Sequence, residues 1–116
     1  MKISKIRELL EAEIHCGEAN LEKEVASVFG CDLMSDVLAY AKDQSILLTG
    51  LVNPQVIRTA VMMDMVCIVF VRSKAPTDEM LSLARESGLV VLSTDMTMYT
   101  ACGKLFINGL VEDTRV

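Results

Sequence analysis

From residue 45 onward, short apolar runs alternate with segments of helical periodicity, and this alternation is the feature that most constrains the fold. The runs are Ile46–Thr49, Val66–Val71 and Leu89–Leu92, and they resemble strands that are buried on both faces. A segment with helical spacing of apolar residues follows each run. Repeated strand–helix units predict a parallel sheet with right-handed crossovers and helices packed on it.

The helical segments carry start and stop signals. Asn53 followed by Pro54 predicts a helix start, with Asn as the N-cap and Pro at the first helical position. Gly88 stands where the next helix is expected to end. Thr94 or Asp95 is predicted to cap the last helix.

The beginning of the chain predicts a helix that ends near Ala12, with Ser4 as its N-cap. Short strands are expected around residues 13–16 and 25–30, and Asp32 is expected to cap a brief helix after the second one.

We therefore expect an α/β fold with a layered, mostly parallel sheet of about four or five short strands flanked by helices. Residues 1–116 are expected to form one domain. Within it, residues 1–44 are the α+β part and residues 45–110 are the repeated βα units.

The charge and the composition of the chain limit the classes of partner that it is expected to bind. The chain has a net charge of −5 and no basic stripe, so we expect it to bind neither nucleic acid nor an anionic membrane. Its apolar runs are too short to span a bilayer, and its start does not read as a signal peptide. A cytoplasmic location is therefore expected, with the four cysteines reduced.

The sequence offers little for catalysis. His15 is the single histidine, and it neighbours Cys16 in a predicted strand, where adjacent side chains point to opposite faces. A metal site built from these two residues with Cys31 and Cys102 has no ligand-spacing signal. We expect no catalytic residue, no metal and no cofactor.

Polar and small residues gather where the predicted parallel strands end. In such a sheet, ligands bind at the carboxyl ends of strands, near helix N-termini. Helix caps alone account for Asn53 and Thr94, whereas Arg72 and Lys74 are not explained by capping. The set would suit an anion such as a nucleotide phosphate. The candidate ligand-binding residues are Thr49, Gly50, Asn53, Arg72, Ser73, Thr94 and Thr97.

Methionine is abundant, with eight residues in the chain. Met62, Met63 and Met65 exceed what one buried helix face holds, which leaves apolar surface for a partner. Small acidic domains with surplus apolar surface often form two-fold dimers, so a homo-oligomer or a protein partner is expected.

Several segments resemble the DRTGG domain family, which is related to the N-terminal domain of HPr kinase/phosphorylase. The likeness runs through Ile6–Leu10, Ser35–Leu38, Leu48–Ala60, Ile68–Arg72 and Thr97–Leu105. The signature residues of the family differ here. Its Gly-Asp-Arg aligns with Gly50-Leu51-Val52, and its Thr-Gly-Gly aligns with Val71-Arg72-Ser73.

The resemblance implies an accessory module, as found beside CBS domains in regulated pyrophosphatases. The chain is thus expected to be a non-catalytic regulatory, ligand-sensing or protein-interaction module that acts as a homodimer or accessory subunit. One alternative is an enzyme that handles a nucleotide or anion at the carboxyl edge of the sheet. Another, implied by similar stand-alone copies, is an assembly factor for a redox enzyme such as a hydrogenase.

Overall fold

The computed structural model describes residues 1–111 of the 116-residue chain. The predicted alternation of strands and helices after residue 45 is confirmed. In chain order the elements are α1 (Ile3–Leu9), β1 (Glu13–Cys16), the 3-10 helix η1 (Glu18–Asn20), β2 (Ser27–Gly30), α2 (Met34–Tyr40), β3 (Ser45–Thr49), α3 (Pro54–Met62), β4 (Cys67–Phe70), α4 (Asp78–Glu86), β5 (Val90–Ser93) and α5 (Met98–Ile107).

The strands form one five-stranded sheet in the order β1-β5-β4-β3-β2. The four strands from β2 to β5 run parallel, and β1 pairs with β5 in the antiparallel direction. The prediction of a layered, mostly parallel sheet is therefore confirmed. Because the parallel strands all end at the same edge, the loops that follow them meet there.

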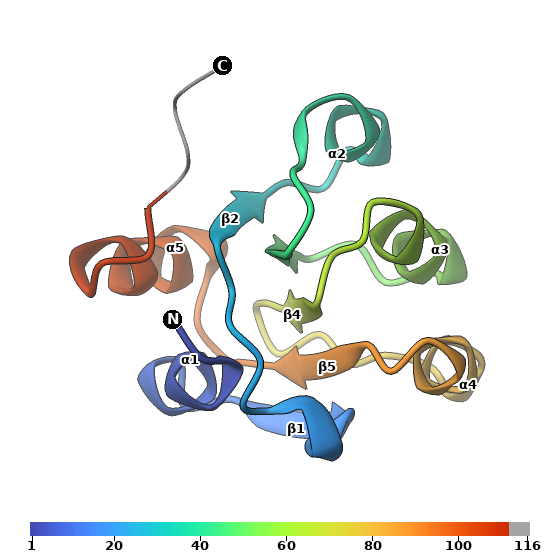
Figure 1. Ribbon diagram of the computed structural model, residues 1–116, viewed down its shortest axis with the longest axis horizontal. Helices are drawn as coiled ribbons and strands as arrows, with labels where there is room; N and C mark the ends of the chain where they lie inside the picture. The colour runs from blue at the N-terminus through green and yellow to red at the C-terminus, as the bar shows by residue number, and fades with distance from the viewer. Residues whose placement is uncertain (112–116) are drawn as a thin grey trace.

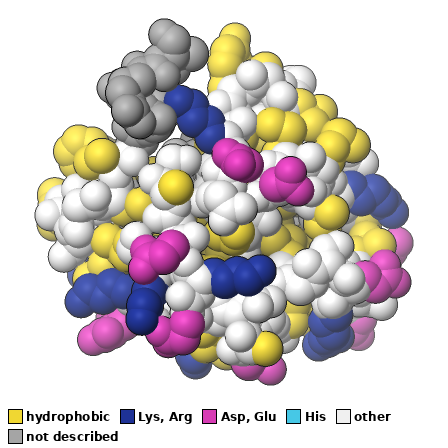
Figure 2. Space-filling view, in the orientation of Figure 1, with side chains coloured by type: hydrophobic (Ala, Val, Ile, Leu, Met, Phe, Trp, Pro, Cys, Tyr) yellow, Lys and Arg dark blue, Asp and Glu magenta, His cyan; other side chains and the backbone are white. Residues whose placement is uncertain are grey.

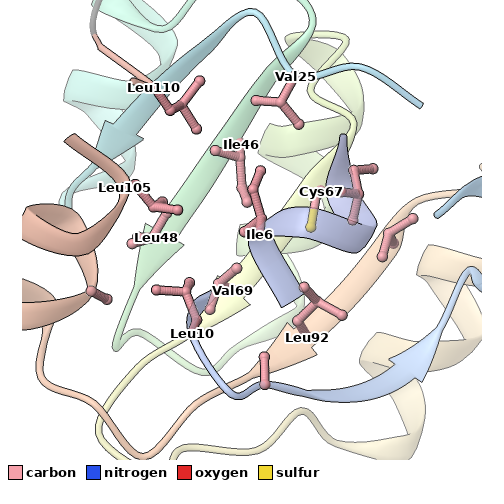
Figure 3. Packing of buried hydrophobic residues seen from close by; sticks show 14 of the residues in the cluster. Ile6, Leu10, Val25, Ile46, Leu48, Cys67, Val69, Leu92, Leu105 and Leu110 are labelled. Atoms are coloured by element: carbon pink, nitrogen blue, oxygen red, sulfur yellow. The ribbon is translucent and has the colours of Figure 1, made fainter. Parts of the chain in front are cut away.

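Helices cover both faces of the sheet, so the domain has three layers (Figure 1). Figure 3 shows the core between the sheet and the α1–α5 side, where Ile6 of α1 lies beside Ile46 of β3 and Leu105 of α5 lies beside Leu48. Leu47 points the other way, into a second core beneath α2, α3 and α4. This two-sided burial explains why the strand runs are continuously apolar.

Three predicted N-caps are wrong, although the helices they belong to exist. The first helix has Lys2 at its N-cap, with Ser4 inside it, and it ends at Leu9 rather than near Ala12. The brief helix α2 has Leu33, not Asp32, at its N-cap.

The last helix begins later than expected, because Thr97 and not Thr94 or Asp95 is its N-cap. The predicted strand at residues 25–30 is present as Ser27–Gly30. Val25 instead donates its backbone N–H to the Met1 carbonyl over 2.7 Å, and its side chain is buried in the first core.

None of the helices among residues 1–111 combines the length and apolar character needed to cross a membrane. The longest, α5, has 10 residues.

Candidate functional site at the carboxyl edge of the sheet

The edge where the parallel strands end brings together most of the predicted site residues. Thr49 ends β3, and Gly50 follows it directly. Arg72 and Ser73 form the turn that leaves β4. Thr94 begins the loop from β5 to α5.

Asp32 joins the first two loops of this edge. Its Oδ1 accepts a hydrogen bond from Thr49 Oγ1 over 2.9 Å and another from the Gly50 N–H over 2.8 Å. Thr49 Oγ1 in turn accepts from the Leu51 N–H over 3.1 Å. The Thr49 side chain is fully buried, so its hydroxyl is committed to holding the loops and is not free for a ligand.

The turn after β4 has an unusual backbone. Arg72 and Ser73 have φ values of 55° and 61°, in the left-handed region that costs side-chain-bearing residues about 1 kcal/mol or more each. Such a conformation persists only where surrounding contacts hold it. Asparagine and glycine would adopt it more readily than arginine or serine.

Three hydrogen bonds hold this turn against the loop between β5 and α5. The Arg72 N–H donates to Met96 O over 2.8 Å, and the Ser73 N–H donates to Thr94 O over 3.0 Å. Ser73 Oγ donates to Asp95 Oδ1 over 2.8 Å. The two loops are therefore held together as one unit, in which the Ser73 hydroxyl already donates its hydrogen bond to Asp95.

The Arg72 side chain reaches back over Gly50. A Cβ on Gly50 would lie 2.6 Å from Arg72 Nη2, so glycine provides the space in which the guanidinium rests. Arg72 is exposed, and its guanidinium makes neither a hydrogen bond nor an ion pair with any residue in the range 1–111. The guanidinium thus presents its five N–H donors at this edge.

Two threonines of the predicted site have structural roles. Thr94 is buried, and its hydroxyl donates to Leu10 O over 2.7 Å at the end of α1. Thr97 caps α5, because its Oγ1 accepts from the Thr100 N–H over 3.3 Å.

Asn53 occupies the predicted N-cap position of α3, but its side chain makes no capping bond. Its Oδ1 is buried without a hydrogen-bond partner among the described residues. An unpartnered buried acceptor is costly, so this amide is a place where a ligand or water would contribute a donor.

His15 and Cys16 have separate hydrogen-bond partners. Nε2 of His15 lies 2.7 Å from Ser93 Oγ, whereas Cys16 Sγ donates to Leu89 O over 3.5 Å. Burial raises the pKa of the Cys16 thiol, which lowers its thiolate fraction at neutral pH. Over residues 1–111, no group of three or more His, Cys, Asp or Glu side chains is placed to hold a metal ion.

Two carboxylates that organise this edge are absent from the predicted ligand-binding residues. Asp32 is predicted to cap a helix, and Asp95 is one of two predicted caps of α5, yet each holds a loop instead. Each lies two residues beyond the end of a strand, and a carboxylate there accepts bonds from a neighbouring loop as readily as from its own helix.

The fold and this edge define a small three-layer α/β domain in which Arg72, exposed and unpaired among residues 1–111, lies at the carboxyl ends of the strands. The sequence model of the DRTGG domain matches residues 5–106, which is most of the chain. The chain belongs to the DRTGG domain family. The predicted resemblance is thereby confirmed.

A solved structure supports the same fold. It is the regulatory region of a Clostridium perfringens pyrophosphatase, with CBS and DRTGG domains, complexed with the activator diadenosine tetraphosphate. The TM-score is 0.73 at 15% sequence identity, and the match covers 99% of this chain. This chain spans about half of that one, 52% of its length. No curated protein matches the sequence.

Proposed function

We propose that this chain is a non-catalytic, ligand-sensing regulatory module that binds a nucleotide at the carboxyl edge of its sheet. The observation that carries the proposal is the Arg72 guanidinium, which is exposed, unpaired within residues 1–111, and placed over Gly50 by a rigid turn. A guanidinium presents a planar fork of donors that matches a phosphate group.

The surroundings of Arg72 favour a nucleotide over a bare phosphate ion. Asp32 and Asp95 lie on the adjoining loops, and their negative charges repel an inorganic phosphate ion. A nucleotide brings hydroxyl and amino donors that carboxylates and the buried Asn53 Oδ1 accept. The similar pyrophosphatase region was likewise solved with a nucleotide, diadenosine tetraphosphate.

The module acts on other proteins rather than on a substrate. In the similar structure, the DRTGG domain is part of a regulatory region. We place this chain in the cytoplasm, as a homodimer or as the accessory subunit of a partner protein.

A thermal-shift panel tests the proposal. It contains AMP, ADP, ATP, diadenosine tetraphosphate, cyclic dinucleotides and inorganic phosphate. A ligand at ten times its Kd stabilises the folded state by about 1.4 kcal/mol, which moves Tm by several degrees in a domain of this size. We expect a shift from at least one nucleotide and a smaller one from inorganic phosphate.

The matched variants are Arg72→Ala and Arg58→Ala. Both arginines are exposed, but Arg58 lies on α3, away from the strand-end loops. We expect Arg72→Ala to lose the nucleotide shift and Arg58→Ala to keep it. A panel without any shift, or a shift that survives in Arg72→Ala, contradicts the proposed site. Turnover of a nucleotide by the wild-type chain, lost in Arg72→Ala, would favour the enzyme alternative.

A further inference from the structure

The two outer edges of the sheet differ in character. At the β1 edge, Glu13 lies within the strand, and a charge in an edge strand opposes pairing with another strand. The β2 edge, Ser27–Gly30, carries no charged residue and has no strand partner on its outer side within residues 1–111. An uncharged free edge of this kind is a template for strand addition.

Exposed apolar side chains flank this edge on both faces of the sheet. A Cβ on Gly30 of β2 would lie 2.9 Å from Cys102 Sγ, so α5 packs directly over the strand. Phe106 is one turn further along the row of Cys102, and it is 64% exposed. On the opposite face, Tyr40 of α2 is 68% exposed and lines a small hollow with Val28 and Phe29.

The figures show the same arrangement. In Figure 1, β2 lies between α5 on one face and α2 on the other. Figure 2 shows apolar side chains at the surface over α5 and over α2, while acidic and basic side chains are interspersed across the rest of this view.

We propose that a second copy of this chain docks on the β2 edge, pairing β2 with its counterpart antiparallel about a two-fold axis and packing the two α5 helices side by side. This inference rests on the proposed regulatory role, in which the chain acts as a homodimer. A two-fold axis perpendicular to the sheet makes identical edge strands antiparallel, so each strand completes the other.

The available area fits a dimer of ordinary size. Four exposed side chains, Tyr40, Tyr99, Phe106 and Ile107, together expose about 600 Å² if each offers about 200 Å² when fully exposed. A stable interface buries about 800 Å² on each partner. The backbone of β2 and the exposed Gly103 and Lys104 of α5 add further area at this surface.

Charge and shape favour a second copy over a different partner. The chain has a net charge of −5, yet Lys104 is the single charged residue of α5 and β2 has none. Few like charges would therefore face each other if two copies met at this surface. Gly103 has nothing within 4 Å of a built Cβ, so a second helix can approach α5 closely there.

Sedimentation equilibrium of the full chain tests the dimer, with Phe106→Glu as the disrupting variant. The matched control is Met62→Glu, because Met62 is 68% exposed on α3, in the helix layer opposite α5. We expect the wild type and Met62→Glu to sediment at twice the 12.7 kDa chain mass at micromolar concentration. Phe106→Glu should weaken the dimer by at least about tenfold.

Hydrogen exchange then separates β2 pairing from contact through α5 alone. The amides of residues 27–30 should exchange more slowly in the wild-type dimer than in Phe106→Glu. A wild-type monomer, a dimer that Phe106→Glu leaves intact, or equal exchange in β2 overturns the inference. A monomer that still binds a nucleotide through Arg72 overturns the dimer alone and leaves the proposed ligand site standing.

Discussion

Asp32 and Thr49 are 17 residues apart in sequence, and the Thr49 hydroxyl donates a hydrogen bond of 2.9 Å to the Asp32 carboxylate. The same carboxylate oxygen accepts from the Gly50 N–H over 2.8 Å. The bonds tie the exit of β2 to the exit of β3, and they fix the place of Gly50, over which the Arg72 guanidinium lies. Asp32 therefore shapes the candidate site without having to contact the ligand itself.

Asp32→Ala should destabilise the fold by about 1–3 kcal/mol, because it leaves the buried Thr49 hydroxyl without an acceptor. Asp32→Asn keeps an acceptor oxygen at the same position, so its loss should be clearly smaller. Urea unfolding followed by circular dichroism measures both. Equal losses in the two variants would show that these hydrogen bonds contribute nothing measurable.

A second prediction follows from the strained turn after β4. Arg72→Gly and Arg72→Ala both remove the guanidinium, but glycine alone adopts a φ of 55° without a steric penalty. We expect Arg72→Gly to be more stable than Arg72→Ala by about 1 kcal/mol in urea unfolding. If alanine is as stable as glycine at this position, the turn carries no strain.

The buried Thr94 hydroxyl should matter for stability rather than for ligand binding. It donates to Leu10 O over 2.7 Å, and the isosteric change Thr94→Val leaves that carbonyl without its donor. A loss of about 1–3 kcal/mol is expected, while Thr94→Ser should retain the bond. The nucleotide Kd of a still-folded Thr94→Val should match the wild type; a large change would return Thr94 to the site.

Alkaline pH should destabilise the protein through its buried thiols. Burial raises the pKa of Cys67 well above the ordinary thiol value of 9.0, so the folded chain keeps a proton that the unfolded chain loses. Unfolding therefore releases a proton above that value, and the free energy of unfolding falls as pH rises, by up to about 1.4 kcal/mol per pH unit for one thiol. Below pH 9.0 this contribution to stability is complete.

Urea titrations at neutral pH and at several values above pH 9.0 measure this slope. Cys67→Ala should start from a lower stability because it leaves a small cavity, and its slope should be shallower. A slope identical to that of the wild type would assign the alkaline loss to other groups. Burial also raises the pKa values of the Cys16 and Cys102 thiols, so part of the slope remains in this variant.

The sheet could be predicted from the sequence because its central strands are buried on both faces. The runs at residues 46–49 and 89–92 leave few alternatives to a covered parallel strand, and their spacing requires a helical crossover. The sequence pattern does not specify that β1 pairs antiparallel with β5, because no helical crossover fixes the direction of this four-residue strand.

The details of the edge could not be predicted, since they depend on contacts between loops that are distant in sequence. Asp32 has the side chain of a helix cap, yet the hydroxyl of Thr49 and the amide of Gly50 compete for its oxygen. The left-handed turn at Arg72 and Ser73 had one available signal. The family signature aligns two glycines with these positions, and glycine is the residue that such a backbone favours.

The hydrogen bonds from the turn to the loop before α5 connect the two proposed surfaces structurally. Arg72 holds Met96 through its backbone, and the next residue, Thr97, caps α5, the helix assigned to the dimer. If a nucleotide on Arg72 alters the affinity between the two copies, dimerisation must alter the nucleotide affinity by the same factor. The nucleotide Kd would then depend on protein concentration, and the module would report its own abundance together with that of its ligand.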